Sequence, residues 1–237
     1  MHKPNIIIIV EGQSEFSAFR RVLAPYLLRL GLICIFPIIG KTGKIKGGHK
    51  DFSILCSMVR NFAAQFPGVY ISAFFDYYGI NPKWPGVFEG KNQACEPHEK
   101  AGLIESAILQ SVIEGDCGRL WSGHFFPYIQ LHELEALWFA DTDIMASILS
   151  PKRADIDLKV QFSQIKQQFN GRSEMINDSP GAAPSKRIEQ FALYQKGKSA
   201  QSQSAPLMEK IGLDKIRQEC PRFNQWLTKL ESIKHEP

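Results

Sequence analysis

The chain has 237 residues, of which 44% are hydrophobic and 22% charged; this composition is typical of a globular protein and excludes disorder as the main state. No apolar run reaches the roughly eighteen residues that a transmembrane helix needs. The apolar residues 6–10 are followed at once by Glu11, so a secretory signal is not expected either. Five cysteines, none in a Cys-x-x-Cys pair, disfavour a disulfide framework or zinc ribbon and make the cytoplasm the expected compartment.

The charge is distributed unevenly along the chain. The net charge is +4, but residues 1–150 carry 13 Lys and Arg against 14 Asp and Glu, whereas residues 151–237 carry 15 against 10. An acidic-to-neutral N-terminal part and a basic C-terminal part indicate a metal-using core beside a surface that accepts phosphates. Alternatively, the basic part is simply a well-solvated helical tail. Charge alone leaves both interpretations open.

Short β-branched and aromatic runs alternate with amphipathic segments over the first 150 residues. Strands are expected at residues 5–10, 32–39, 69–75 and 125–131. Helical spacing of apolar residues predicts helices at 15–30, 51–66, 99–114 and 132–149. Repeated strand–helix alternation predicts an α/β fold, Rossmann-like, with a mainly parallel four-stranded sheet flanked by helices.

The remaining segments are expected to be loops and a helical tail. Residues 40–48 form a glycine-rich basic loop, and residues 76–97, rich in Pro, Gly, Trp and Asn, are expected to form a long functional loop. After residue 150 the strand signals stop, and helices are expected at 157–170, 186–196 and 206–233, with a mobile low-complexity connection at 196–204. We therefore expect an α/β domain over residues 1–150 and a helical extension packed on it over residues 151–237.

Acidic residues follow three of the four expected strands. Glu11 follows the first strand, Asp76 the third, and Glu133 and Glu135 the fourth. The carboxyl ends of parallel strands meet at one sheet edge, where clustered carboxylates repel one another unless a cation neutralises them. Oxygen ligands favour Mg²⁺ or Mn²⁺. Alternatively, each acid is only a helix cap or a first-turn residue favoured by the helix dipole.

Within this set, Glu135 is preferred to Glu133. His132 and Glu135 are three residues apart and would share one face of the expected helix, whereas Glu133 would point elsewhere. His132 is alternatively a helix cap or a hydrogen-bonded polar residue. Glu15, one turn beyond Glu11, either shares the site or is a solvated first-turn glutamate.

Two of these acidic segments resemble a known pair of motifs. VEGQSE at 10–15 and FFDYYG at 74–79 look like the acidic motifs of the Toprim fold, which occurs in topoisomerases, primases and OLD nucleases. Together with HELEALWFAD at 132–141 and PSKRI at 184–188, they resemble the prokaryotic DUF4276 family of Toprim-like proteins. The resemblance implies a Toprim-like fold, with Glu11 as the Toprim glutamate and Asp76 as the first aspartate of Asp-x-Asp. Tyr78 replaces the second aspartate, and Glu135 or Glu133 is the candidate substitute.

The resemblance implies a Mg²⁺- or Mn²⁺-dependent nuclease in which Glu11, Asp76 and Glu135 are both metal ligands and catalytic residues. Phosphate contacts are expected from the basic loop and from the start of the helix at 186, through Lys41, Lys44, Lys46, Lys50, Lys186 and Arg187. The family further suggests prokaryotic defence beside an ATPase partner protein. A non-catalytic module that docks to an ATPase, and a nucleotidyl transferase, remain alternatives.

Overall fold

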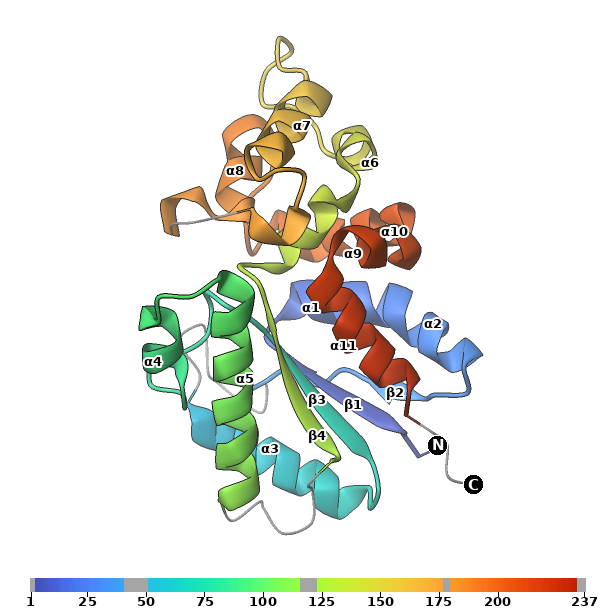
Figure 1. Ribbon diagram of the computed structural model, residues 1–237. Helices are drawn as coiled ribbons and strands as arrows, with labels where there is room; N and C mark the ends of the chain where they lie inside the picture. The colour runs from blue at the N-terminus through green and yellow to red at the C-terminus, as the bar shows by residue number, and fades with distance from the viewer. Residues whose placement is uncertain (1–2, 41–50, 116–122, 177–179, 234–237) are drawn as a thin grey trace. The chain divides into compact units, whose positions relative to one another are not determined.

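The computed structural model describes residues 3–40, 51–115, 123–176 and 180–233 (Figure 1). The chain divides into two compact units. The first comprises residues 1–12, 24–130 and 230–237, and the second comprises residues 13–23 and 131–229. The boundary expected near residue 150 falls inside the second unit, and an independent domain over residues 1–150 stays a prediction.

The first unit contains the parallel sheet that the sequence predicts. Its strands are β1 (Ile6–Val10), β2 (Cys34–Ile35), β3 (Tyr70–Asp76) and β4 (Phe125–Gln130), in the order β2-β1-β3-β4. All neighbours pair in parallel. The expected four-stranded parallel sheet flanked by helices is therefore confirmed.

The second strand is much shorter than the expected run at 32–39. Only two residues pair continuously with β1, and beyond them Val10 and Ile38 form an isolated bridge. Pro37 lies between these two pairings and lacks the N–H that a continuous ladder requires, although its carbonyl accepts a hydrogen bond from Val10. A β-rich composition was therefore a poor guide to the length of this edge strand.

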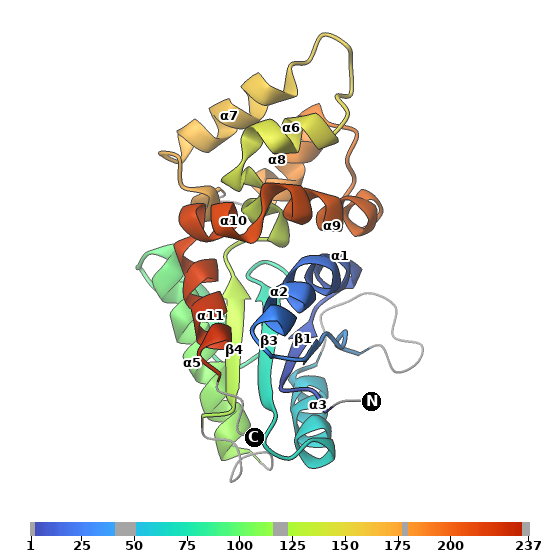
Figure 2. The same ribbon diagram turned by 90° about the vertical axis from the view of Figure 1, so that its right-hand side faces the viewer.

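Helices cover both faces of the sheet. The first unit contains α2 (Ala24–Arg29), α3 (Phe52–Gln65), α4 (Val87–Asn92) and α5 (Pro97–Glu114). The chain passes from β1 to β2 in one direction across the sheet and from β2 to β3 and β4 in the other. Because crossovers between parallel strands are right-handed, α2 lies on one face of the sheet and α3 and α5 lie on the other. Figures 1 and 2 show this arrangement, with α3 and α5 on the face opposite α2. All five residues of β1 are consequently fully buried.

The segment 76–97 is not a continuous loop. It contains α4, and α5 begins at Pro97, two residues earlier than expected. Glu96 and Glu99 form a capping box at the start of α5, with Pro97 in the first turn. The Pro and Gly content of the segment therefore concealed a short helix and a helix start.

The second unit is helical. It contains α1 (Gln13–Ala18), a π-helical segment (Phe19–Leu23), a 3₁₀ helix (Leu134–Ala140), two 3₁₀ turns (Ser173–Met175 and Pro180–Ala182), the helices α6 (Thr142–Ile148), α7 (Leu158–Gln168), α8 (Pro184–Phe191), α9 (Ser199–Ile211) and α10 (Leu213–Glu219), and α11 (Pro221–Glu231) as far as Lys229. In the described residues beyond 150, β-structure is limited to an isolated bridge between Pro151 and Ala192, which confirms the helical C-terminal part. No helix in the described part of the chain combines the length and apolarity needed to cross a membrane.

Several predicted segments were wrong in extent, among them the expected helix 132–149, which is the 3₁₀ helix Leu134–Ala140 followed by α6. The expected helix 15–30 is α1, the π-helical segment and α2, and the expected helix 206–233 is divided between α9, α10 and α11. Gly212, at φ 83°, separates α9 from α10. The expected connection at 196–204 is helical from Ser199 onward, because α9 begins there.

A buried carboxylate fixes the start of α11. Glu174, only 5% exposed, accepts hydrogen bonds from the backbone N–H groups of Arg222 and Phe223 at 3.0 and 2.9 Å. Burial raises the pKa of Glu174, and the two N–H bonds and the Arg222 charge only partly oppose this rise. The folded state therefore binds this proton more tightly than the unfolded state does.

Glu174→Ala should therefore lower the free energy of unfolding by an amount that depends on pH. Two backbone donors lose their acceptor, which costs about 1–3 kcal/mol. Because the folded pKa is raised, the advantage of the wild type is largest below the unfolded pKa and shrinks as pH rises through the folded value. Urea unfolding at pH 4 and pH 7 measures this difference, and a larger advantage at pH 7 would contradict it.

Candidate functional site

The first unit brings Glu11 against the segment that follows β3. Glu11 follows β1 directly and Asp76 is the last residue of β3, and these strands are parallel neighbours with Val10 opposite Phe74. The backbone N–H of Asp76 donates to Oε2 of Glu11 at 3.4 Å. Glu11 and Asp76 therefore belong to one sheet edge, as the sequence predicts.

Gly79 makes room for the Glu11 carboxylate. A Cβ atom at Gly79 would lie 2.7 and 2.8 Å from the two carboxylate oxygens of Glu11, closer than real Cβ contacts. A cavity of about 20 Å³ lies beside them, and Asn81 and Trp84 contribute to its lining. A single water molecule needs roughly 10–15 Å³ by the same measure, so the cavity accepts one water-sized particle.

This edge supplies few protein ligands for a metal ion. Within the four described ranges, no group of three or more His, Cys, Asp or Glu side chains is placed to hold one. Mg²⁺ commonly keeps several water ligands and binds through only one or two carboxylates together with substrate phosphates. The oxygen donors at this edge therefore fit Mg²⁺ in that form and do not fit a cage built from protein alone.

The second unit contains a different cluster of buried carboxylates. Glu133 is 5% exposed and Glu135 is 2% exposed. The expectation that His132 and Glu135 share a helix face was wrong, because His132 has a left-handed backbone at φ 67° and Glu133 is extended. The 3₁₀ helix begins only at Leu134, so α-helical spacing does not apply to these side chains.

Glu133 binds both a helix start and a lysine. Its Oε2 accepts the backbone N–H of Ser185, in the first turn of α8, at 2.9 Å. Its Oε1 accepts a hydrogen bond from Nζ of Lys196 at 2.6 Å. The positive end of the helix dipole and the lysine charge together compensate the burial of this carboxylate. Glu133 therefore belongs to the same buried cluster as Glu135, and the preference for Glu135 as the metal ligand stays a prediction.

Glu135 accepts a hydrogen bond from the hydroxyl of Tyr194, whose ring packs edge-on against Trp138 with centroids 5.6 Å apart. Burial raises the pKa of Glu135, and the neighbouring Glu133 charge raises it further, whereas Lys196 lowers it. Burial and the Glu135 charge also raise the pKa of Tyr194, so that its hydroxyl keeps the proton it donates. The cluster thus contains one carboxylate that holds a proton more readily than an ordinary glutamate does.

The remaining predicted residues are placed as follows. Lys186 pairs with Glu189 at 2.7 Å, and the Arg187 guanidinium donates to the carbonyl of Ala182 and to Gln168. The cation that contacts Glu133 is Lys196 instead.

Glu15 was expected either to share the acidic site or to be a solvated glutamate in the first turn of a helix. The residue is 7% exposed, so it is not a solvated glutamate. The predicted phosphate-binding residues of the basic loop lie outside the described residues: Lys41, Lys44, Lys46 and Lys50.

Sequence reasoning missed three residues of these sites. Gly79 lies in the noted DYYG motif, but only the packing of Glu11 shows why a glycine is needed there. Tyr194 and Lys196 are separated from Glu133 and Glu135 by about sixty residues, and no local pattern marks them. Lys196 begins the stretch that low complexity assigned to a connection, so composition pointed away from it.

Comparison with solved structures gives matches to the C-terminal region of the Xanthomonas campestris pv. campestris OLD protein. The structure phased with iodine aligns at 16% identity over 96% of this chain and 98% of that chain, with a TM-score of 0.36. The structure phased with platinum aligns at 15% identity over 95% and 94%, with a TM-score of 0.34.

Comparison with curated proteins finds no match. The family model of DUF4276, described as a domain of unknown function, matches residues 10–231. This range includes all four motifs on which the resemblance was based. Since the match extends over most of the sequence, the chain belongs to the DUF4276 family.

Proposed function

We propose that the protein is a Mg²⁺-dependent phosphodiester hydrolase that acts on nucleic acid. The observation that carries the proposal is the packing of the Glu11 carboxylate against the Asp76–Gly79 turn, at the carboxyl ends of two adjacent parallel strands. Ligand sites of open α/β sheets commonly lie at this edge. The resemblance of VEGQSE and FFDYYG to the Toprim motifs gives the same two acids their roles.

In this proposal Glu11 and Asp76 hold the ion. When bound, Mg²⁺ would neutralise charge on phosphoryl oxygens and lower the pKa of a water molecule. Glu135 is the third proposed ligand, and one of the three carboxylates or a bound water would accept the proton. The participation of Glu135 rests on the family resemblance, because this residue belongs to the second unit.

The test is cleavage of labelled DNA and RNA, single- and double-stranded, with Mg²⁺ or Mn²⁺. Glu11→Gln and Asp76→Asn should each lower the rate roughly 100-fold or more, since each removes a charged ligand or a proton-transfer group. Glu89→Gln, at an exposed position of α4, is the matched control and should cleave as the wild type does. Equal traces of activity in all four proteins would identify a contaminant and contradict the proposal.

The second candidate is a non-catalytic module that docks to an ATPase partner. Two observations favour it: Tyr78 in place of the second aspartate, and the lack of a three-residue metal group among the residues described. Calorimetry with Mg²⁺ separates the candidates, because a docking module should give no binding heat that depends on Glu11 or Asp76. For both candidates, the hydrolase and the docking module, we further propose a role in prokaryotic defence.

A further inference from the structure

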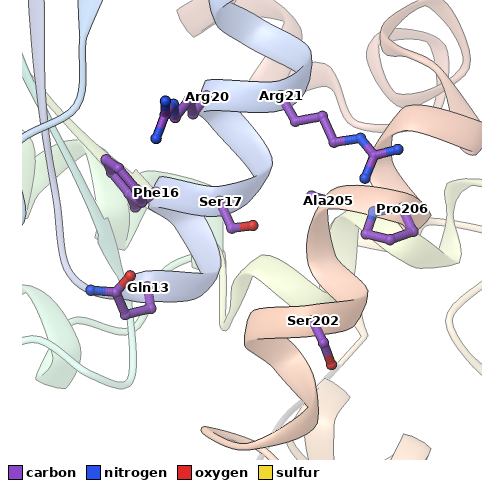
Figure 3. A pocket seen from close by; sticks show the side chains of 8 residues that line it. All are labelled: Gln13, Phe16, Ser17, Arg20, Arg21, Ser202, Ala205 and Pro206. Carbon is purple, nitrogen blue, oxygen red and sulfur yellow. The ribbon is translucent and has the colours of Figure 1, made fainter.

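A cleft of about 580 Å³ lies in the second unit (Figure 3). One wall consists of α1 and the π-helical segment, through Gln13, Phe16, Ser17, Arg20 and Arg21; the other is α9, through residues between 202 and 206. Its volume is in the range of about 300–1,000 Å³ typical of ligand sites. The cleft shares no lining residue with the two carboxylate sites.

A local change of helix geometry places the arginines. Residues 13, 16–17 and 20–21 recur every three or four positions and therefore lie one above another along the helix. Arg20 and Arg21 lie in the π-helical turn Phe19–Leu23, and single π turns inside α-helices are rare and occur frequently at functional sites. Figure 3 shows Arg20 on the same side of the helix as Phe16, and Arg21 directed toward α9.

The chemistry of the cleft is suited to an anion with an aromatic group. The Arg20 guanidinium lies 6.0 Å from the centroid of the Phe16 ring, and Arg21 pairs with Glu209 at 2.6 Å. The side chains of Arg21 and Glu209 are 54% and 50% exposed. Exposed pairs of this kind contribute little to stability, so a phosphate can replace Glu209 at small cost. Among the described lining residues there are two arginines and no carboxylate.

We propose that this cleft binds single-stranded nucleic acid, with Arg20 and Arg21 on backbone phosphates and Phe16 stacked on a base. This inference rests on the proposed function and adds to it a contact surface for the substrate strand. Small-ligand sites bury most of the ligand, whereas these arginines are exposed to solvent and suit a polymer that passes across them. Grooves for single strands combine cations with aromatic side chains in the same way.

The test is fluorescence anisotropy with labelled oligothymidylate in EDTA, where metal-dependent cleavage does not interfere. Arg20→Gln and Arg21→Gln should each weaken binding roughly three- to tenfold and reduce the slope of log K against log salt by about 0.7. Phe16→Leu keeps an apolar side chain but removes the ring, and should weaken binding about fivefold without changing the slope. Glu209→Gln should tighten binding, because it removes the carboxylate that competes for Arg21.

Arg153→Gln is the control, since Arg153 is 72% exposed and pairs with Asp155 away from the cleft. Equal losses for Arg153→Gln and the cleft variants, or an unchanged salt slope in Arg20→Gln and Arg21→Gln, would overturn the inference. Binding of ATP or inorganic triphosphate that the oligonucleotide does not displace would also overturn it, in favour of a small-ligand site. If the cleft variants weaken binding but neither the wild type nor any variant cleaves nucleic acid, the hydrolase proposal is contradicted and the inference about the cleft is supported.

Discussion

Under the proposed function, Gly79→Ala should lower both Mg²⁺ affinity and cleavage roughly 10–100-fold, the usual loss when a residue that orients a metal ligand is changed. The added Cβ would meet both carboxylate oxygens of Glu11 at under 3.0 Å, so the Glu11 side chain has to move. The φ angle of Gly79 is not in the left-handed region, so an alanine backbone is unstrained there and the steric contact alone is tested. Calorimetric titration with Mg²⁺ and the cleavage assay measure the two effects.

Gly102→Ala is the matched control for this substitution. Gly102 lies inside α5, and a Cβ there would meet no atom within 4 Å. Alanine in a helix interior should stabilise the fold by roughly 0.5–1 kcal/mol and leave metal binding unchanged. Wild-type metal affinity and cleavage in Gly79→Ala would show that the position of the Glu11 carboxylate does not matter for the reaction.

Lys196→Met should lower the free energy of unfolding by about 2–3 kcal/mol, because removal of one partner leaves a buried charge uncompensated. The Glu133 side chain is 6% exposed. In the variant, of the contacts to described residues, its carboxylate would keep only the hydrogen bond from the backbone N–H of Ser185. The lysine is 43% exposed, so the loss is smaller than for a wholly buried pair. Guanidinium unfolding at neutral pH measures it.

Lys186→Met is the corresponding control, since Lys186 also pairs with a glutamate but is 55% exposed. It should cost at most about 0.5 kcal/mol. Adding Glu133→Gln to Lys196→Met should restore part of the lost stability, because a neutral amide oxygen still accepts the Ser185 N–H. A loss in Lys196→Met no larger than in Lys186→Met would show that the cluster does not need this cation.

The sheet and its main helices were predictable because the signals are local. Five consecutive β-branched residues at Ile6–Val10 are typical of a strand that is buried on both faces of a parallel sheet, and all five are fully buried in the structure. The same local reasoning failed for the segment after β4. His132 has a left-handed backbone, and the expected helix 132–149 is instead a 3₁₀ helix over Leu134–Ala140 followed by α6, which Asp141 caps.

The sequence was sufficient to predict the strand–helix alternation, the family and the placement of Glu11 and Asp76 at one sheet edge. Parallel strands carry the acids that follow them to a common edge, whatever the details of packing. Tertiary structure alone decided that Glu133 and Glu135 are buried with Lys196 and Tyr194, and that a π-helical turn carries two arginines to a cleft beside α9. These contacts join residues about sixty or more positions apart, and no pattern within a window of one helix or strand contains that information.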